Sequence, residues 1–179
     1  NNTTISENVG GTFGGGINLS SGFVVAVDCM ISANSATYGG GIYTDHYLTL
    51  VNSTVSGNTG GGIRISRGRT VLRSATVVSN VLRGGVSSMT WEPLTVANTI
   101  IAGNSGGSAP DCGTTLTSEG YNLIGDMTGC TFIGDTTGNI TGRDPLLGLL
   151  VDNGGPTDTH ALLTESPAID AGNPAGCVD

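Results

Sequence analysis

The chain of 179 residues contains no lysine and little aromatic or charged material, with aromatic residues at 4% and charged residues at 11% of the sequence. All six basic residues are arginines, and they face fourteen Asp and Glu, which leaves a formal net charge of −8. Such an acidic chain lacks the basic surface that binds phosphate backbones, so we expect no nucleic-acid partner. Helix-favouring residues are thinly used beside Thr, Val, Ile, Ser and Asn, which indicates an all-β protein.

Long apolar runs are absent as well. No stretch approaches the ~18 consecutive apolar residues of a membrane-spanning helix, so we expect no membrane span. No initiator Met or signal sequence opens the chain, and a repeat is already under way at Asn2. Four cysteines without metal-ligand spacing are typical of an oxidising compartment. We therefore expect a processed piece of a longer, exported protein.

What the sequence does contain is a repeat. Five short phrases, beginning with TISEN and ending with IIAGN, each close on an asparagine, and the successive asparagines lie 26, 24, 22 and 24 positions apart. A period in the twenties with so little scatter indicates one supersecondary unit repeated along a solenoid. The closing residues are Asn8, Asn34, Asn58, Asn80 and Asn104.

Each repeat contains three strand-like segments. An alternating segment such as Val24, Ala26, Asp28 precedes each phrase, and a GGGI segment recurs at residues 14–17, 39–42 and 60–63. If each strand pairs with its equivalent one turn later, backbone groups are satisfied and one apolar face is enclosed, which gives a parallel β-helix. The five asparagines would stack as an amide ladder beside an aliphatic ladder of Ile5, Ile31, Val55, Val77 and Ile101.

The main competing fold is a leucine-rich repeat, which has a similar period. It requires regular leucines before each Asn, and this sequence has Ile, Ser, Val and Gly in those positions. We predict about six to seven coils over residues 1–142. Residues 143–179 are dense in Pro, Gly and Asp and do not repeat, so we predict that they form an irregular cap over the coil end within the same domain.

The cysteines divide into two pairs. Cys112 and Cys130 lie 18 positions apart, about one coil, and we predict a disulfide between them that stabilises the fold by ~3 kcal/mol. Cys29 and Cys177 lie near opposite ends of the chain. We treat these two as candidate thiols for a disulfide between molecules stacked head to tail.

The C-terminal block resembles a known family. The phrases GYNLIGD, DPLLGLL, NGGPTDTHALL (153–163) and SPAIDAG (166–172) are similar to the C-terminal region of choice-of-anchor Q domain proteins, and the GGGI and ISxN phrases are similar to repeats of polymorphic outer-membrane proteins. The resemblance implies a right-handed parallel β-helix on a bacterial cell surface, often described as pectate-lyase-like, and no established reaction. It covers most of the chain.

Candidate chemistry is sparse. The acids of the coils stand singly, with Asp45 beside His46 as the one local acid and imidazole pair, and we expect that pair to form a solvated turn. We assign no catalytic residue and no cofactor, and we treat His160 as a packing residue of the cap. Asp144, Asp152 and Asp158 are candidates for Ca²⁺ ligands. A candidate polyanion patch comprises Arg64, Arg67, Arg69 and Arg83.

We therefore expect a non-enzymatic, extracellular structural or adhesive module that associates through its coil ends, with a head-to-tail filament as its extended form and cell-surface glycans as candidate partners. The alternative is a polysaccharide-binding β-helix, or a polysaccharide lyase or hydrolase of the pectate-lyase-like type, in which the arginine patch faces the sugar.

Overall fold

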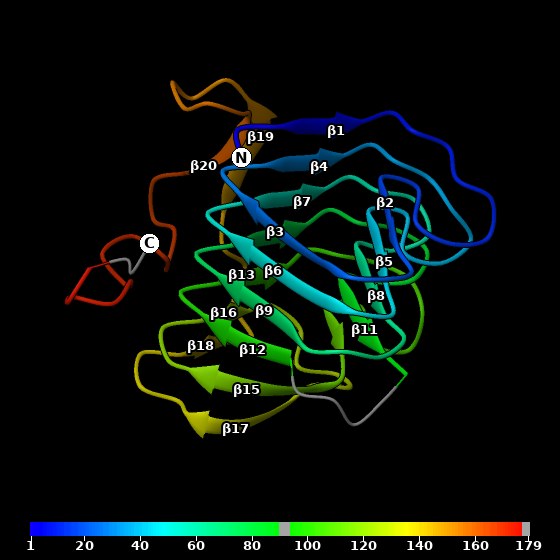
Figure 1. The fold of residues 1–179 in the computed structure, drawn as a ribbon. Helices are drawn as coiled ribbons and strands as arrows, with labels where there is room; N and C mark the ends of the chain where they lie inside the picture. Colours follow the sequence, from blue (N-terminus) through cyan, green and yellow to red (C-terminus); the bar gives the residue numbers. More distant parts are fainter. Residues whose placement is uncertain (90–93, 177–179) are drawn as a thin grey trace.

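The computed structural model describes residues 1–89 and 94–176. Its parallel strands coil into a β-helix with three sheets running along the axis (Figure 1). The first fifteen strands make five complete coils of three strands each, and β16, β17 and β18 continue the stack. The predicted all-β parallel β-helix is confirmed, whereas the coil count of six to seven was slightly too high.

The first sheet contains the strands that carry the five TISEN-type phrases, followed by two further strands. All seven are parallel, and each pairs with its equivalent in the next coil. In order they are β1 (Thr4–Ser6), β4 (Met30–Ser32), β7 (Thr54–Ser56), β10 (Thr76–Val78), β13 (Ile100–Ala102), β16 (Leu123–Ile124) and β18 (Ile140–Thr141).

The second sheet contains the strands that end the GGGI phrases and their counterparts. It has five parallel strands: β2 (Ile17–Leu19), β5 (Ile42–Thr44), β8 (Ile63–Ile65), β11 (Val86–Ser88) and β14 (Cys112–Gly113). The third sheet holds the alternating segments. Its six parallel strands are β3 (Phe23–Val27), β6 (Tyr47–Val51), β9 (Thr70–Arg73), β12 (Leu94–Ala97), β15 (Thr115–Glu119) and β17 (Thr131–Asp135).

The core between the sheets is built from columns of identical or similar side chains. The predicted aliphatic column is in register, since Ile5 pairs with Ile31, Ile31 with Val55, Val55 with Val77 and Val77 with Ile101. The second sheet adds Ile17, Ile42, Ile63 and Val86, and the third adds Leu48, Leu50, Leu72, Leu94, Val96 and Leu116. Fully burying such a side chain stabilises the fold by ~1.5–3 kcal/mol.

Two of the corners require a left-handed backbone. The residue before each ladder asparagine has positive φ, as at Ala33 (54°) and Ser79 (57°), and so does the residue that follows the third-sheet strand in each coil, as at Asn52 (45°) and Asn98 (48°). Asn and Gly tolerate this conformation more readily than other residues, which explains part of their abundance. The same backbone conformation therefore recurs at these two corner positions in each coil, even where the residue type differs.

The C-terminal segment lies along the side of the β-helix, whereas the sequence predicted a cap over the coil end. The antiparallel strands β19 (Leu147–Val151) and β20 (Thr159–Leu162) run back towards the first coils (Figure 1). Thr157 Oγ1 lies 3.4 Å from the carbonyl oxygen of Asp28, and His160 Nε2 lies 2.9 Å from Ser56 Oγ. Further along, Asn173 N–H donates to Asn98 Oδ1 at 2.9 Å.

This side cover explains an unusual burial pattern in the first sheet. The strands β4 and β7 are buried at every residue, including outward-facing positions such as Ser32 and Ser56. Small residues on the outer face let the hairpin approach closely, and its Leu147, Leu150 and His160 line a cavity together with Ser56, Val78 and Ala102. By contrast, the outermost strand β17 is mostly exposed, and its Ile133 has 55% of its surface accessible.

Candidate functional site

The five asparagines form a continuous row of amides along the first corner. Each Nδ2 donates to the Oδ1 of the asparagine one coil further on, from Asn8 to Asn104, at 2.9–3.1 Å. Each Oδ1 also accepts the backbone N–H of the preceding asparagine at 2.9–3.0 Å. From Asn34 onwards, each Nδ2 also donates to a first-sheet carbonyl, such as that of Ile31 for Asn58. The arrangement is the one that the repeat predicts.

A buried carboxylate ends this row. Asp111 Oδ1 accepts both Nδ2 and the backbone N–H of Asn104 at 2.9 Å, and its Oδ2 accepts the backbone N–H of Asp126 at 2.7 Å. Asp111 therefore takes the place that the next asparagine would occupy. Sequence reasoning missed it because it lies only seven positions after Asn104 and breaks the period.

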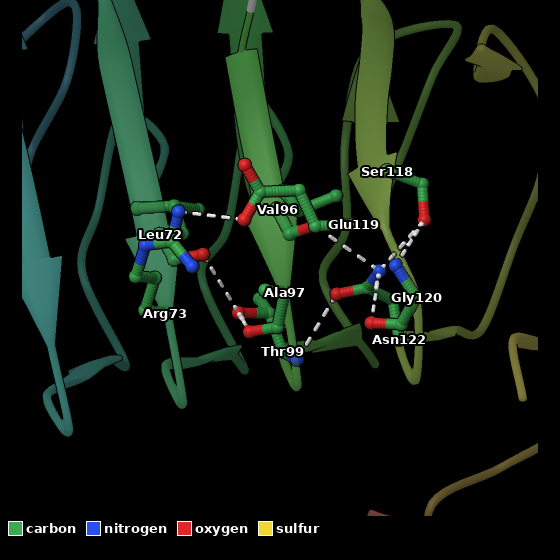
Figure 2. Close-up of polar contacts among 9 residues, drawn as sticks. All are labelled: Leu72, Arg73, Val96, Ala97, Thr99, Ser118, Glu119, Gly120 and Asn122. Atoms are coloured by element: carbon green, nitrogen blue, oxygen red, sulfur yellow. Dashed lines mark hydrogen bonds and ion pairs between the residues drawn. The ribbon is translucent and has the colours of Figure 1, made fainter. Parts of the chain in front are cut away.

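A second ladder lies at the corner that follows the third sheet. Thr99 N–H donates to Asn122 Oδ1 at 3.1 Å, and Asn122 N–H donates to Asn139 Oδ1 at 2.8 Å. Figure 2 shows Asn122 Nδ2 directed at Ser118 Oγ and at the carbonyl of Gly120, both at 3.0 Å. Earlier coils use smaller groups, since Cys29 N–H donates to Ser53 Oγ at 3.1 Å.

An ion pair crosses the outer face of the third sheet near this corner. Arg73 Nη2 lies 2.6 Å from Glu119 Oε2 (Figure 2). Arg73 is paired in register with Ala97 of the intervening strand, and the small Ala97 side chain leaves room for the two long side chains to meet. Both are at least one third exposed, so the pair contributes little to stability.

The predicted polyanion patch divides into two parts. The guanidinium carbons of Arg83 and Arg64 lie 4.1 Å and 6.0 Å from the centre of the Tyr38 ring. Arg67 and Arg69 are exposed in the turn between β8 and β9, on the opposite side of β8 from the turn that carries Arg83, and neither contacts Tyr38. The structure therefore brings together two of the four arginines.

Three aromatic rings complete the cluster around these two arginines. The Phe13 ring lies 4.4 Å from the Tyr43 ring and 5.9 Å from the Tyr38 ring, measured between centroids. Sequence reasoning missed these rings, although a signal was present: Phe13 and Tyr38 stand directly before two of the GGGI phrases. We call Phe13, Tyr38, Tyr43, Arg64 and Arg83 the arginine–aromatic cluster.

Electrostatics in this cluster are unbalanced. Burial lowers the pKa of the Arg64 guanidinium, and the positive charge of Arg83 lowers it further, while Tyr38 and Tyr43 act in the opposite direction. Arg64 Nη1 donates to Ser87 Oγ at 3.0 Å, but its buried Nε has no hydrogen-bond partner among the described residues. Within that part of the chain, the Arg73–Glu119 pair is the only ion pair.

Two of the three predicted Ca²⁺ ligands accept hydrogen bonds within their own turns. Asp144 Oδ1 accepts the N–H of Leu146 at 2.8 Å, and Asp152 Oδ1 accepts the N–H of Gly154 at 2.8 Å. Across residues 1–89 and 94–176, no three His, Cys, Asp or Glu side chains are grouped as metal ligands, so Asp144, Asp152 and Asp158 are not brought together. Asp45 accepts from the Tyr43 hydroxyl at 3.2 Å.

His160 occupies a position in the side cover. Its Nδ1 donates to the Gly148 carbonyl at 2.7 Å within the hairpin, and its Nε2 faces Ser56 Oγ. The imidazole therefore connects the hairpin to the first sheet. Hydrogen bonds from Thr128 and Thr137 lower the pKa of the exposed Asp126 and Asp135 carboxylates, respectively, and these contacts also belong to local turns.

The cysteines behave differently from one another. Cys112 and Cys130 form a disulfide with Cα atoms 5.4 Å apart, which confirms the predicted bridge. Cys29 is a free thiol with only 4% of its surface accessible, packed in the core and directed at the Val27 carbonyl. A thiol buried in this way cannot reach a second molecule, so our hypothesis for Cys29 was wrong. Cys177 lies outside the described residues.

Comparisons with known proteins add no relative. No protein-family model, no curated protein and no solved structure matches the chain. The described part of the chain has no helix that is both long and apolar enough to cross a membrane. The features of this chain that bear on its function are therefore the coils, their corners and the arginine–aromatic cluster.

Proposed function

We propose that the chain is an extracellular structural and adhesive β-helix module of a bacterial cell surface. The observation that carries this proposal is the amide row from Asn8 to Asp111, which ties consecutive coils to one another by side chains as well as by strand pairing. A solenoid reinforced in this way is suited to mechanical durability. The disulfide and the resemblance of the C-terminal block to cell-surface proteins support the setting.

We further propose that the module associates through its coil ends. Because the hairpin packs along the side of the first sheet, it does not cover the end of the stack. There the strand β17 presents an exposed edge. At the other end, the backbone of β1 and the Asn8 side chain can receive a further coil, supplied by more of the same protein or by another molecule. Unpaired strand edges are templates for such pairing, and contacts that do not close into a ring produce filaments.

Sedimentation velocity over a wide concentration range, combined with electron microscopy, tests the association. We expect rods longer than one module and a sedimentation coefficient that rises with concentration. Ile133→Lys places a charge on the β17 edge and should weaken association. Leu149→Lys changes an equally apolar exposed residue of the hairpin and is the matched control. A purely monomeric protein at high concentration would refute association through the coil ends.

The alternative of a polysaccharide-binding β-helix is favoured by one specific observation, the arginine–aromatic cluster. It is compatible with an adhesive module, because adhesion to a surface requires a ligand. Incubation with acidic polysaccharides, monitored for unsaturated or shortened products, tests the cleaving form of this alternative.

A further inference from the structure

We propose that Arg64 and Arg83 bind the carboxylate groups of an acidic polysaccharide, with the rings of Phe13 and Tyr38 supporting the sugar. This inference rests on the adhesive role proposed above and names its class of ligand. It concerns two arginines of the predicted patch, and it assigns no part to Arg67 and Arg69.

Unequal turn lengths build the site. Ile42 comes eight positions after Asn34, but Ile63 comes only five positions after Asn58, and the short turn contains Gly60, Gly61 and Gly62. A Cβ at Gly61 would lie 3.2 Å from the Arg83 Cβ. Because the third coil presents no side chain at these glycines, Arg83 of the fourth coil reaches across to Tyr38 of the second.

The charges at this position call for an anion. Arg64 and Arg83 lie against one ring, and no carboxylate of the described residues is within ion-pair distance of either. The pKa of Arg64 is lowered by burial and by its neighbour, which means that its charged form is destabilised there. An oxyanion between the two guanidinium groups would offset both effects, and a carboxylate matches the planar guanidinium fork.

The aromatic rings favour a sugar as the carrier of that carboxylate. Phe13 is 43% exposed and stacks with Tyr38, the ring that both guanidinium groups approach. The electron-rich face of an aromatic ring attracts the polarised C–H groups that a pyranose presents on its flat side. Phe13 and Tyr38 are equivalent residues of successive coils, and such residues repeat every ~4.8 Å, comparable with the length of one sugar residue. An acidic peptide would use the arginines but has no need of the rings.

Binding of polygalacturonate by isothermal titration calorimetry at physiological ionic strength tests the inference. Under these conditions the Debye length is ~8 Å, so distant negative charges of the protein are screened while direct contacts persist. We expect Arg83→Gln to weaken binding about tenfold, the loss typical of one hydrogen-bonded charge contact. We expect Arg69→Gln, an equal change of net charge at an exposed position, to alter binding less than about twofold. Circular dichroism would verify that both variants fold.

The outcomes separate cleanly. Absence of polygalacturonate binding, or equal losses in the two variants, would overturn the site. Polyglutamate binding as tightly as polygalacturonate would overturn the assignment to a sugar, and a loss of binding in Phe13→Ala with retention of fold would support it. Association is measured independently by sedimentation, so rods that do not bind polygalacturonate would refute this inference alone, whereas monomers that bind it would refute only the coil-end association.

Discussion

The two laddered corners of the coil solve the same problem with different side chains. At the first corner, one residue type recurs in five successive coils, and each amide both accepts and donates. At the second corner, the equivalent positions hold Cys29, Ser53, Ala75, Thr99, Asn122 and Asn139. At the second corner, a hydroxyl or an amide accepts the corner N–H where the next coil supplies one, and Ala75 supplies none. A continuous row requires more, namely a side chain long enough for its donor to reach the acceptor of the next coil, as an amide does.

The largest loss of stability is expected for Asn58→Ala, in the middle of the amide row at the first corner. The change removes the acceptor for Asn34 Nδ2 and N–H, and the donor to Ile31 O and Asn80 Oδ1, all in a buried setting. Several unsatisfied groups of ~1–3 kcal/mol each imply a loss of about 4 kcal/mol in the free energy of unfolding. Guanidinium denaturation measures it. Asn58→Leu, which fills the volume without hydrogen bonding, should be destabilised to a similar extent.

The next effect is expected where the first ladder ends. Asp111→Ala leaves two N–H groups of Asn104 and one of Asp126 without this acceptor, which should cost about 3 kcal/mol. Asp111→Asn retains the acceptor towards Asn104 and should recover part of the loss. A full loss in both variants in thermal unfolding would mean that the carboxylate charge, rather than its hydrogen bonds, matters.

Ser53→Ala tests the second corner in the same coil as Asn58. Its Oγ accepts one backbone N–H, from Cys29, and lies 2.7 Å from the Val51 carbonyl as donor. The expected loss is about 1 kcal/mol, well below that of Asn58→Ala. Equal losses at the two positions, measured by the same denaturation, would contradict the contrast between a continuous row and an isolated acceptor.

The smallest effect is expected for the ion pair on the third sheet. A double-mutant cycle of Arg73→Gln and Glu119→Gln should give a coupling of about 0.5 kcal/mol, decreasing with added salt, because both side chains are partly exposed. A coupling energy larger than the stability lost in Ser53→Ala would show that surface electrostatics hold the coils together more than the second corner does.

The sequence allowed the first corner to be predicted because one residue type marks it. The second corner was missed because Cys29, Ser53 and Ala75 share only their small size. The side cover could not be read from the sequence at all, since its contact between Thr157 and Asp28 joins residues 129 positions apart. Four arginines that are close in the sequence were likewise predicted to form one patch. Which of them meet depends on the different turn lengths of the second and third coils, and these bring only Arg64 and Arg83 to the same ring.

The amide row also gives the β-helix an electrical direction. Every Nδ2 from Asn8 to Asn104 points towards the later coils, so the side-chain dipoles add along the axis as peptide dipoles do in a helix. The positive end of this array meets the Asp111 carboxylate, and the negative end is the Asn8 carbonyl oxygen. The row can therefore grow in one sense only. Any coil placed before Asn8 must arrive with an amide donor, and a coil inverted end for end would bring acceptor against acceptor.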